Sequence, residues 1–254
     1  MKPIDAHPID VMNMTHMRCS VPLLCACLFL GWTAAGAVCD AVPAATPGAL
    51  LSKASDEPRS TVPKGAKLTY RRVFKSSTPE FIEIVVQEDS DAGTYEIRQL
   101  DEDPGALPFE ISATLRAKMF ELAGQLNHFQ RQDLDVHRKI ANLGEKTFRW
   151  EQGSEVHETR FNYTLNSAAN QLLQIFEGLA REQEHLTLIA RRMKYDRLGI
   201  NDALLQFETD FNHSLLPEPR RALPVLDQIA SDSRFVEIAR QRARALAERI
   251  RHQT

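Results

Sequence analysis

All four cysteines of this 254-residue chain lie near its N-terminus, within a segment that has the anatomy of an export signal. Arg18 precedes an apolar run at 21–32, and the small residues Ala35-Gly36-Ala37 match the site that a signal peptidase cleaves. Cleavage before Val38 would leave Cys39 alone, so the remaining chain could form no internal disulfide. We therefore expect residues 1–37 to be a signal peptide, and we expect the rest to depend on a hydrophobic core. The cysteines are Cys19, Cys25, Cys27 and Cys39.

Two alternatives to simple cleavage remain open. A lipoprotein anchored at Cys39 is less favoured, because such sites have a small residue just before the cysteine and this chain has Val38. An uncleaved anchor or a chain that is not exported is the other alternative, although for an anchor the apolar run at 21–32 is shorter than the roughly 20 residues that cross a bilayer. A disulfide-free exported protein suits a bacterial envelope, so we expect a periplasmic or secreted location.

The composition is that of an ordinary soluble globular protein, with 43% hydrophobic and 26% charged residues. It excludes a mostly disordered chain, a collagen-like repeat and a protein with many membrane spans. The formal net charge of -3 gives no global attraction to nucleic acid, so we expect no nucleic-acid partner. Residues 38–66 contain four prolines and few large apolar side chains, which predicts a disordered linker.

The periodicity after residue 66 predicts an α+β fold. Residues 68–74, 81–86 and 94–100 alternate as strands do, and a loop is expected over 101–108. Ser112 is a plausible N-cap for a helix with apolar residues at 115, 119, 122 and 126. A weak strand over 136–143 and a hairpin of 146–151 and 155–163, turning at Gly153, come next, and a long helix follows to about residue 197.

The remainder of the chain is predicted to be helical. Asn201 is the expected start of one helix, Pro217 and Pro219 open another, and Ser231 or Ser233 is expected to cap the last. The predicted fold class is α+β: a strands-helix-hairpin-helix domain over 67–180, with a helical extension over 181–254.

One stretch carries a resemblance. Residues 145–181 read EKTFRWEQGSEVHETRFNYTLNSAANQLLQIFEGLAR, a hairpin followed by an amphipathic helix. With the preceding strands and helix, this order resembles small uncharacterised domains of exported bacterial proteins, and it is similar to emfourin-type inhibitors of metalloproteases. The resemblance implies a compact α+β domain that acts on a protein partner. It rests on element order over 68–181 and assigns no functional residue.

The sequence contains no familiar catalytic or cofactor-binding motif. The G-x-S-x-G elbow, the G-x-G-x-x-G and G-x-x-x-x-G-K-[ST] phosphate loops and the H-E-x-x-H zinc motif are all missing. Glu182 and His185 form a single E-x-x-H, whereas a di-iron carboxylate site needs two. We therefore expect no catalytic residue, no metal ligand and no cofactor. The alternative is a metal-dependent hydrolase whose ligands are dispersed over His128, His137 and His157.

Two groups of residues are candidates for binding. Phe148, Trp150 and Tyr163 share one face of the predicted hairpin, where they form either core or a hot spot for a partner. From residue 234 to 251 the last helix carries six arginines and two glutamates, a local charge of +4, and we single out Arg240 and Arg244. A basic helix can bind an anionic membrane surface, which is a second alternative function. The leading prediction is an exported, non-catalytic module that binds a protein partner in the bacterial envelope, as an inhibitor or an assembly factor.

Overall fold

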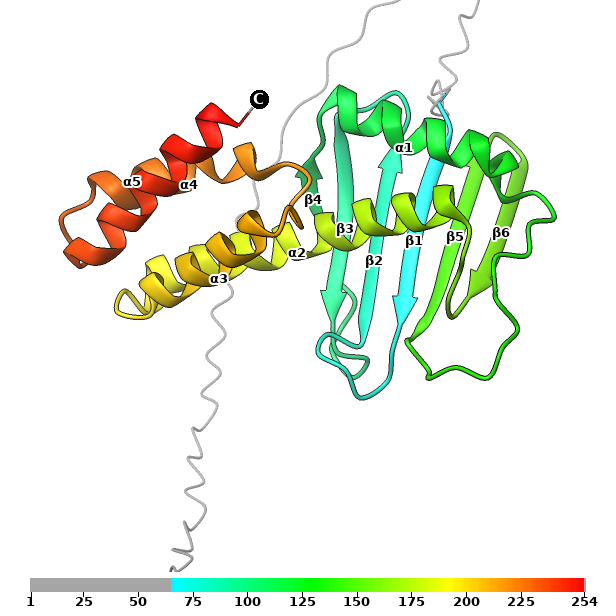
Figure 1. Ribbon diagram of the computed structural model, residues 1–254, viewed down its shortest axis with the longest axis horizontal. Coiled ribbons are helices and arrows are strands. Elements are labelled where there is room, and N and C mark those ends of the chain that lie inside the picture. Colours follow the sequence, from blue (N-terminus) through cyan, green and yellow to red (C-terminus); the bar gives the residue numbers. More distant parts are fainter. Residues whose placement is uncertain (1–64, 254) are drawn as a thin grey trace, which may run out of the picture. The chain divides into compact units, whose positions relative to one another are not determined.

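The computed structural model describes residues 65–253, which form a six-stranded sheet with five α-helices (Figure 1). The predicted signal peptide, Cys39 and all but the last two residues of the predicted linker lie outside the described residues. The α+β fold class with C-terminal helices is confirmed. The elements, in chain order, are β1 (Lys67–Val73), β2 (Phe81–Gln87), β3 (Ala92–Arg98), β4 (Leu107–Glu110), α1 (Ala113–Gln125), the 3-10 helix η1 (Asn127–Phe129), β5 (Glu145–Gln152), β6 (Glu155–Phe161), α2 (Ser167–Tyr195), α3 (Ile200–Asn212), the 3-10 helix η2 (Pro219–Ala222), α4 (Leu223–Ser231) and α5 (Glu237–His252).

The sheet is antiparallel throughout, with the strand order β4-β3-β2-β1-β5-β6. The first four strands form a meander. After α1 the chain returns to the opposite edge of β1, so that Leu68 pairs with Val86 of β2 on one side and with Trp150 of β5 on the other. This arrangement places β1 near the centre of the sheet.

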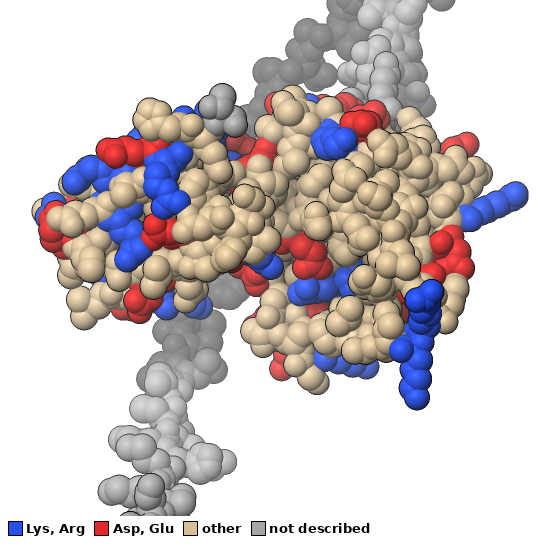
Figure 2. Space-filling view, in the orientation of Figure 1, with Lys and Arg blue, Asp and Glu red and all other residues tan. Residues whose placement is uncertain are grey.

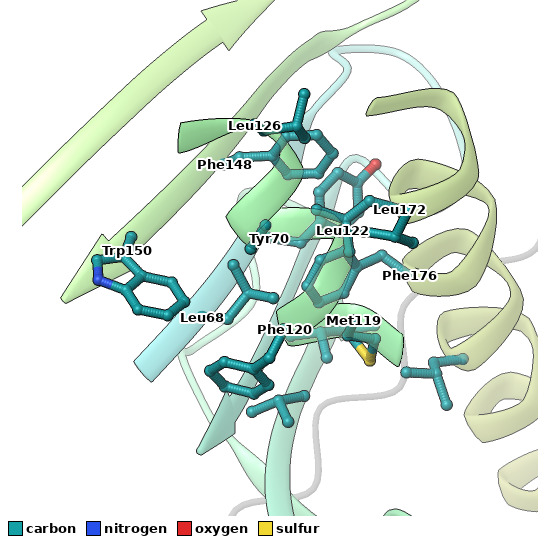
Figure 3. Close-up of a cluster of buried hydrophobic side chains, with 14 of the residues drawn as sticks. Leu68, Tyr70, Met119, Phe120, Leu122, Leu126, Phe148, Trp150, Leu172 and Phe176 are labelled. Atoms are coloured by element: carbon teal, nitrogen blue, oxygen red, sulfur yellow. The ribbon is translucent and has the colours of Figure 1, made fainter. Parts of the chain in front are cut away.

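Both α1 and α2 cover the same face of the sheet (Figure 1). Figure 3 shows the layer between them, where Tyr70 and Phe148 from the sheet meet Phe176 from α2 and Leu122 from α1. Tyr70 stacks on Phe176 with ring centroids 5.1 Å apart. The opposite face carries charged cross-strand and same-strand pairs, including Arg71–Glu83, Arg98–Glu96 and Arg160–Glu158. One-sided burial explains the alternation of buried and partly exposed residues along β2.

Helix α2 has 29 residues and packs in two hydrophobic clusters. Its first half, up to Ala180, packs on the sheet and α1. From Leu186 onward it packs on α3, α4 and α5. The predicted boundary between an α+β domain and a helical extension, at residues 180 and 181, falls within this continuous helix.

Four sequence-based predictions of local structure are wrong. Residues 136–143 form an irregular segment without a strand. Conversely, β4 lies partly inside the predicted loop, at a sheet edge, which is where a strand tolerates a proline such as Pro108. Helix α3 has Gly199 as its N-cap in place of Asn201, and α5 has Val236 in place of a serine, because Ser231 ends α4. By contrast, Ser112 is confirmed as the N-cap of α1, since its hydroxyl accepts a hydrogen bond from the Leu115 N–H.

Candidate functional site

A groove of about 1050 Å³ lies between the edge of the sheet and the C-terminal helices. One wall is the junction of β4 and α1, with Glu110, Ile111 and Ala113. The other wall consists of residues 216–221, which are the end of the connection after α3 and the first part of η2, and of Ile250 of α5. The groove therefore brings together parts of the chain that are far apart in sequence.

Hydrogen bonds to Glu218 hold the two walls together. The Ser112 N–H, at the N-terminus of α1, donates to the Glu218 carboxylate over 3.0 Å and 3.3 Å. In the other direction, the Glu218 N–H donates to Oε1 of Glu182 on α2 over 2.7 Å. A carboxylate at a helix N-terminus is favoured by the helix dipole and by the free backbone N–H groups there. Glu218 thus connects α1 to α2 and fixes the position of the groove wall.

The Glu182 carboxyl group is a buried acid at this junction. Its residue is 2% exposed, and its Oε2 atom has no hydrogen-bond partner among the described residues. Loss of solvation disfavours the charged form and raises the pKa of Glu182 to about 8, although the bond from the Glu218 N–H opposes this shift. At neutral pH the group is therefore mostly protonated, and it can act as a hydrogen-bond donor as well as an acceptor.

Arg221 is the second group at the junction with unused hydrogen-bonding capacity. Its Nη1 atom is buried and has no partner within residues 65–253, and its guanidinium lies 5.5 Å from the centroid of the Phe109 ring. Arg221 and Glu218 both line the groove. The groove accordingly offers an arginine donor and a carboxylate next to apolar side chains.

The structure does not bring the three predicted aromatic binding residues together at one surface. Phe148 is fully buried and stacks on Phe129 with centroids 5.3 Å apart, so it is core. Trp150 is 5% exposed and borders a separate hollow of about 480 Å³ with Phe120 and His128. Tyr163 is exposed, because β6 ends two residues earlier at Phe161. A binding role for Trp150 and Tyr163 stays a prediction.

The arginines of the last helix are mostly engaged in ion pairs with neighbouring helices. Glu208 of α3 pairs with both Arg242 and Arg249, and Asp227 of α4 pairs with Arg251. Arg240, one of the two predicted binding residues, pairs with Glu237. The other, Arg244, is exposed, and among the described residues it reaches only the Ala230 carbonyl, over 3.5 Å. Figure 2 shows the result, with basic and acidic side chains interleaved over the C-terminal helices.

Two of the three histidines of the hydrolase alternative, His128 and His157, neighbour Trp150, whereas His137 lies in the irregular segment before β5. The His128 ring lies on Trp150 with centroids 4.2 Å apart, His157 is opposite Trp150 on β6, and His137 contacts Asp133 over 2.6 Å. Within the described part of the chain, no group of three or more His, Cys, Asp or Glu side chains has an arrangement that could hold a metal ion. Glu182 and His185 also have separate partners, since His185 contacts Asp210 over 2.8 Å.

Sequence reasoning missed Glu218 and Arg221 as site residues. Glu218 lies between Pro217 and Pro219, a pattern that signals a chain break but not the partner of the carboxylate. No protein-family model matches this chain, and no curated protein matches it either. Among the helices at residues 65–253, none combines the length and the apolar character that a membrane span needs.

Proposed function

We propose that this chain is an exported, non-catalytic module that binds a partner protein in the bacterial envelope. The observation that carries this proposal is the groove between β4, α1 and the C-terminal helices. At about 1050 Å³ it lies at the upper end of the size range of pockets that bury a drug-sized ligand, which is room enough for side chains of a bound peptide.

The lining of the groove supports a peptide as its occupant. Ala92, Pro217 and Pro219 are accessible and supply apolar contact, while Glu110 and Arg221 supply a carboxylate and a guanidinium that can pair with polar groups of a peptide. Pro108 in β4 limits the backbone hydrogen bonds that a peptide could add at this sheet edge. We therefore propose recognition through side chains in the groove instead of addition of a strand.

The similarity in element order to emfourin-type inhibitors makes an inhibitor the favoured kind of module, with a protease as one class of partner. An assembly factor that holds a segment of an envelope protein would use the same groove. Both the inhibitor and the assembly factor would need the groove to be open in the isolated protein.

A phage-displayed library of random peptides, selected on the purified full chain, tests the proposal. Ala113→Trp places a large ring in the groove from the exposed first residue of α1. We expect selected peptides to bind this variant at least tenfold more weakly than the wild type. Ala245→Trp is the matched control, because Ala245 is an exposed helical alanine on α5 outside the groove lining.

Peptides that bind both variants as tightly as the wild type would contradict the groove as the binding site. Elemental analysis of the same preparation addresses the hydrolase alternative, since a stoichiometric bound metal would favour an enzyme.

A further inference from the structure

The most exposed large apolar side chains among the described residues lie where α2 ends and turns into α3. Leu198 is 80% exposed and Tyr195 is 73% exposed. Arg191, Lys194 and Tyr195 lie on one side of the last turns of α2, at spacings of three residues and one residue, and Leu198 follows in the non-helical turn before α3, so that these four residues form an exposed stripe. This stripe is not part of either hydrophobic cluster.

The turn between α4 and α5 lies beside this stripe. Lys194 of α2 borders the same hollow as Asp232, Arg234 and Phe235 from that turn. In Figure 1 the yellow turn after α2 and the orange turn before α5 lie at the same end of the helical layer, away from the sheet. The start of α5, directly after the turn from α4, adds Ile238, which is 58% exposed. We define residues 191–198 and 234–238 as the distal tip.

The distal tip has cations that are not used in ion pairs. Residues 191–198 contain four basic residues and one acidic residue. Arg191, Lys194 and Arg197 are exposed and form no ion pair within residues 65–253. The acidic side chains of the tip and the neighbouring Asp232 already have partners other than these three cations. Asp196 accepts the Gly199 N–H, Asp232 pairs with Arg234, and Glu237 pairs with Arg240. The arginines of α5 differ, since most of them pair with α3 and α4.

We infer that the distal tip binds the surface of an anionic phospholipid membrane. Exposed apolar side chains can enter the boundary between headgroups and acyl chains, and a tyrosine is well suited to that boundary. The surrounding free cations would contact the negatively charged headgroups, and Lys194 lies over the Tyr195 ring at 4.9 Å from its centroid. The combination of protruding apolar groups with unpaired cations favours a lipid surface over an uncharged partner.

The membrane contact would leave the groove accessible. The groove borders Ile250 near the C-terminal end of α5, whereas Ile238 of the tip lies in its first turn. A rise of about 1.5 Å per residue separates these two positions by roughly 18 Å along the helix. The inference does not rest on the proposed peptide binding, so each can fail independently.

Quenching of a tryptophan at the tip provides a local test in the full chain. Leu198→Trp is mixed with vesicles of phosphatidylglycerol and phosphatidylcholine whose acyl chains carry bromine, which quenches tryptophan on contact. We expect the added emission of Leu198→Trp to fall at least twofold with anionic vesicles, and to change little with pure phosphatidylcholine. Leu107→Trp is the control, because Leu107 is an exposed residue of β4 that is 51% exposed.

Charge variants identify the cations that matter. Adding Arg191→Ala, Lys194→Ala and Arg197→Ala to Leu198→Trp should abolish the quenching, whereas adding Arg138→Ala and Lys139→Ala, two exposed cations outside the tip, should preserve it. Unchanged Leu198→Trp emission with anionic vesicles would overturn the inference, and so would equal quenching of Leu107→Trp. A tip that contacts a protein instead of lipid would give the first of these results.

Discussion

The backbone N–H of Glu218 donates a 2.7 Å hydrogen bond to the carboxyl group of Glu182, which is buried in α2. The carboxylate of Glu218 in turn accepts the Ser112 N–H at the start of α1. One residue in the segment between α3 and α4 therefore connects both helices that cover the sheet. The C-terminal helices are held to the sheet layer by this polar bridge as well as by the continuous helix α2.

The first prediction concerns the pH dependence of stability at this bridge. The pKa of Glu182 rises from its ordinary value of 4.5 to about 8 in the folded protein, so the folded state binds the proton more tightly than the unfolded state. The associated stability is fully present below about pH 4.5 and is lost as the pH rises through 8. Glu182→Gln keeps an oxygen for the Glu218 N–H and cannot ionise.

We expect the free energy of unfolding in urea to fall less steeply with pH in Glu182→Gln than in the wild type. The two proteins should have similar stability at pH 5, and the variant should be more stable by about 1–3 kcal/mol at pH 9. Parallel curves for the two proteins between pH 5 and pH 9 would show that the carboxyl group does not titrate as its burial requires.

Much of the fold could be predicted from the sequence because apolar residues recur with the period of each element. The alternation in β2, Phe81–Gln87, and the three-four spacing from Leu115 to Leu126 are of this kind. β4 could not be recognised, because it has four residues, one of them a proline, and it exists only through pairing with β3. Short edge strands depend on their neighbours more than on their own propensity.

The candidate site could not be predicted, because its contacts join distant parts of the chain. Ser112 and Glu218 are separated by 106 positions, and neither residue carries a motif. The charge of α5 was apparent from the sequence, but its neutralisation by Glu208 and Asp227 depends on how α3 and α4 pack. Phe148, Trp150 and Tyr163 were predicted to share a face because they are an even number of positions apart along their strands. Tyr163, however, lies beyond the end of β6.

The second prediction separates the buried and exposed aromatics of the hairpin. Phe148 makes ring contacts with Tyr70, Phe129, Phe161 and Phe176 and is fully buried. We expect Phe148→Ala to lower the free energy of unfolding in urea by about 3–5 kcal/mol, the usual cost of a cavity of this size. Tyr163→Ala should change stability by less than about 0.5 kcal/mol. A small effect of Phe148→Ala would mean that the ring is not core.

The third prediction compares two tyrosine hydroxyls. The Tyr70 hydroxyl lies in the core and donates to the Glu177 carboxylate, which also accepts a 3.0 Å bond from Arg72. Hydrogen bonds to charged groups contribute about 1.5–3 kcal/mol, so Tyr70→Phe should lower stability by roughly that amount. Tyr95→Phe is the control, because its hydroxyl is 3.4 Å from that of Thr187 in an exposed position. Stability is measured by thermal and by urea unfolding. If Tyr70→Phe and Tyr95→Phe lowered it equally, the buried hydrogen bond of Tyr70 would have no special role.

The last prediction tests whether the charge of α5 serves the packing of the C-terminal helices. Glu208 of α3 is half-buried and pairs with both Arg242 and Arg249, so Glu208→Gln leaves two guanidinium groups without their carboxylate. We expect a loss of about 1–2 kcal/mol in the free energy of unfolding at low ionic strength, because charge-assisted bonds in partly buried positions exceed ordinary surface pairs. The loss should shrink in high salt, which screens the wild-type pairs.

Arg244→Gln should change stability by less than about 0.5 kcal/mol, since Arg244 has no carboxylate partner among the described residues. If Glu208→Gln is as neutral as Arg244→Gln, the arginines of α5 are solvated and available to an external anionic surface, and the distinction between this helix and the distal tip disappears.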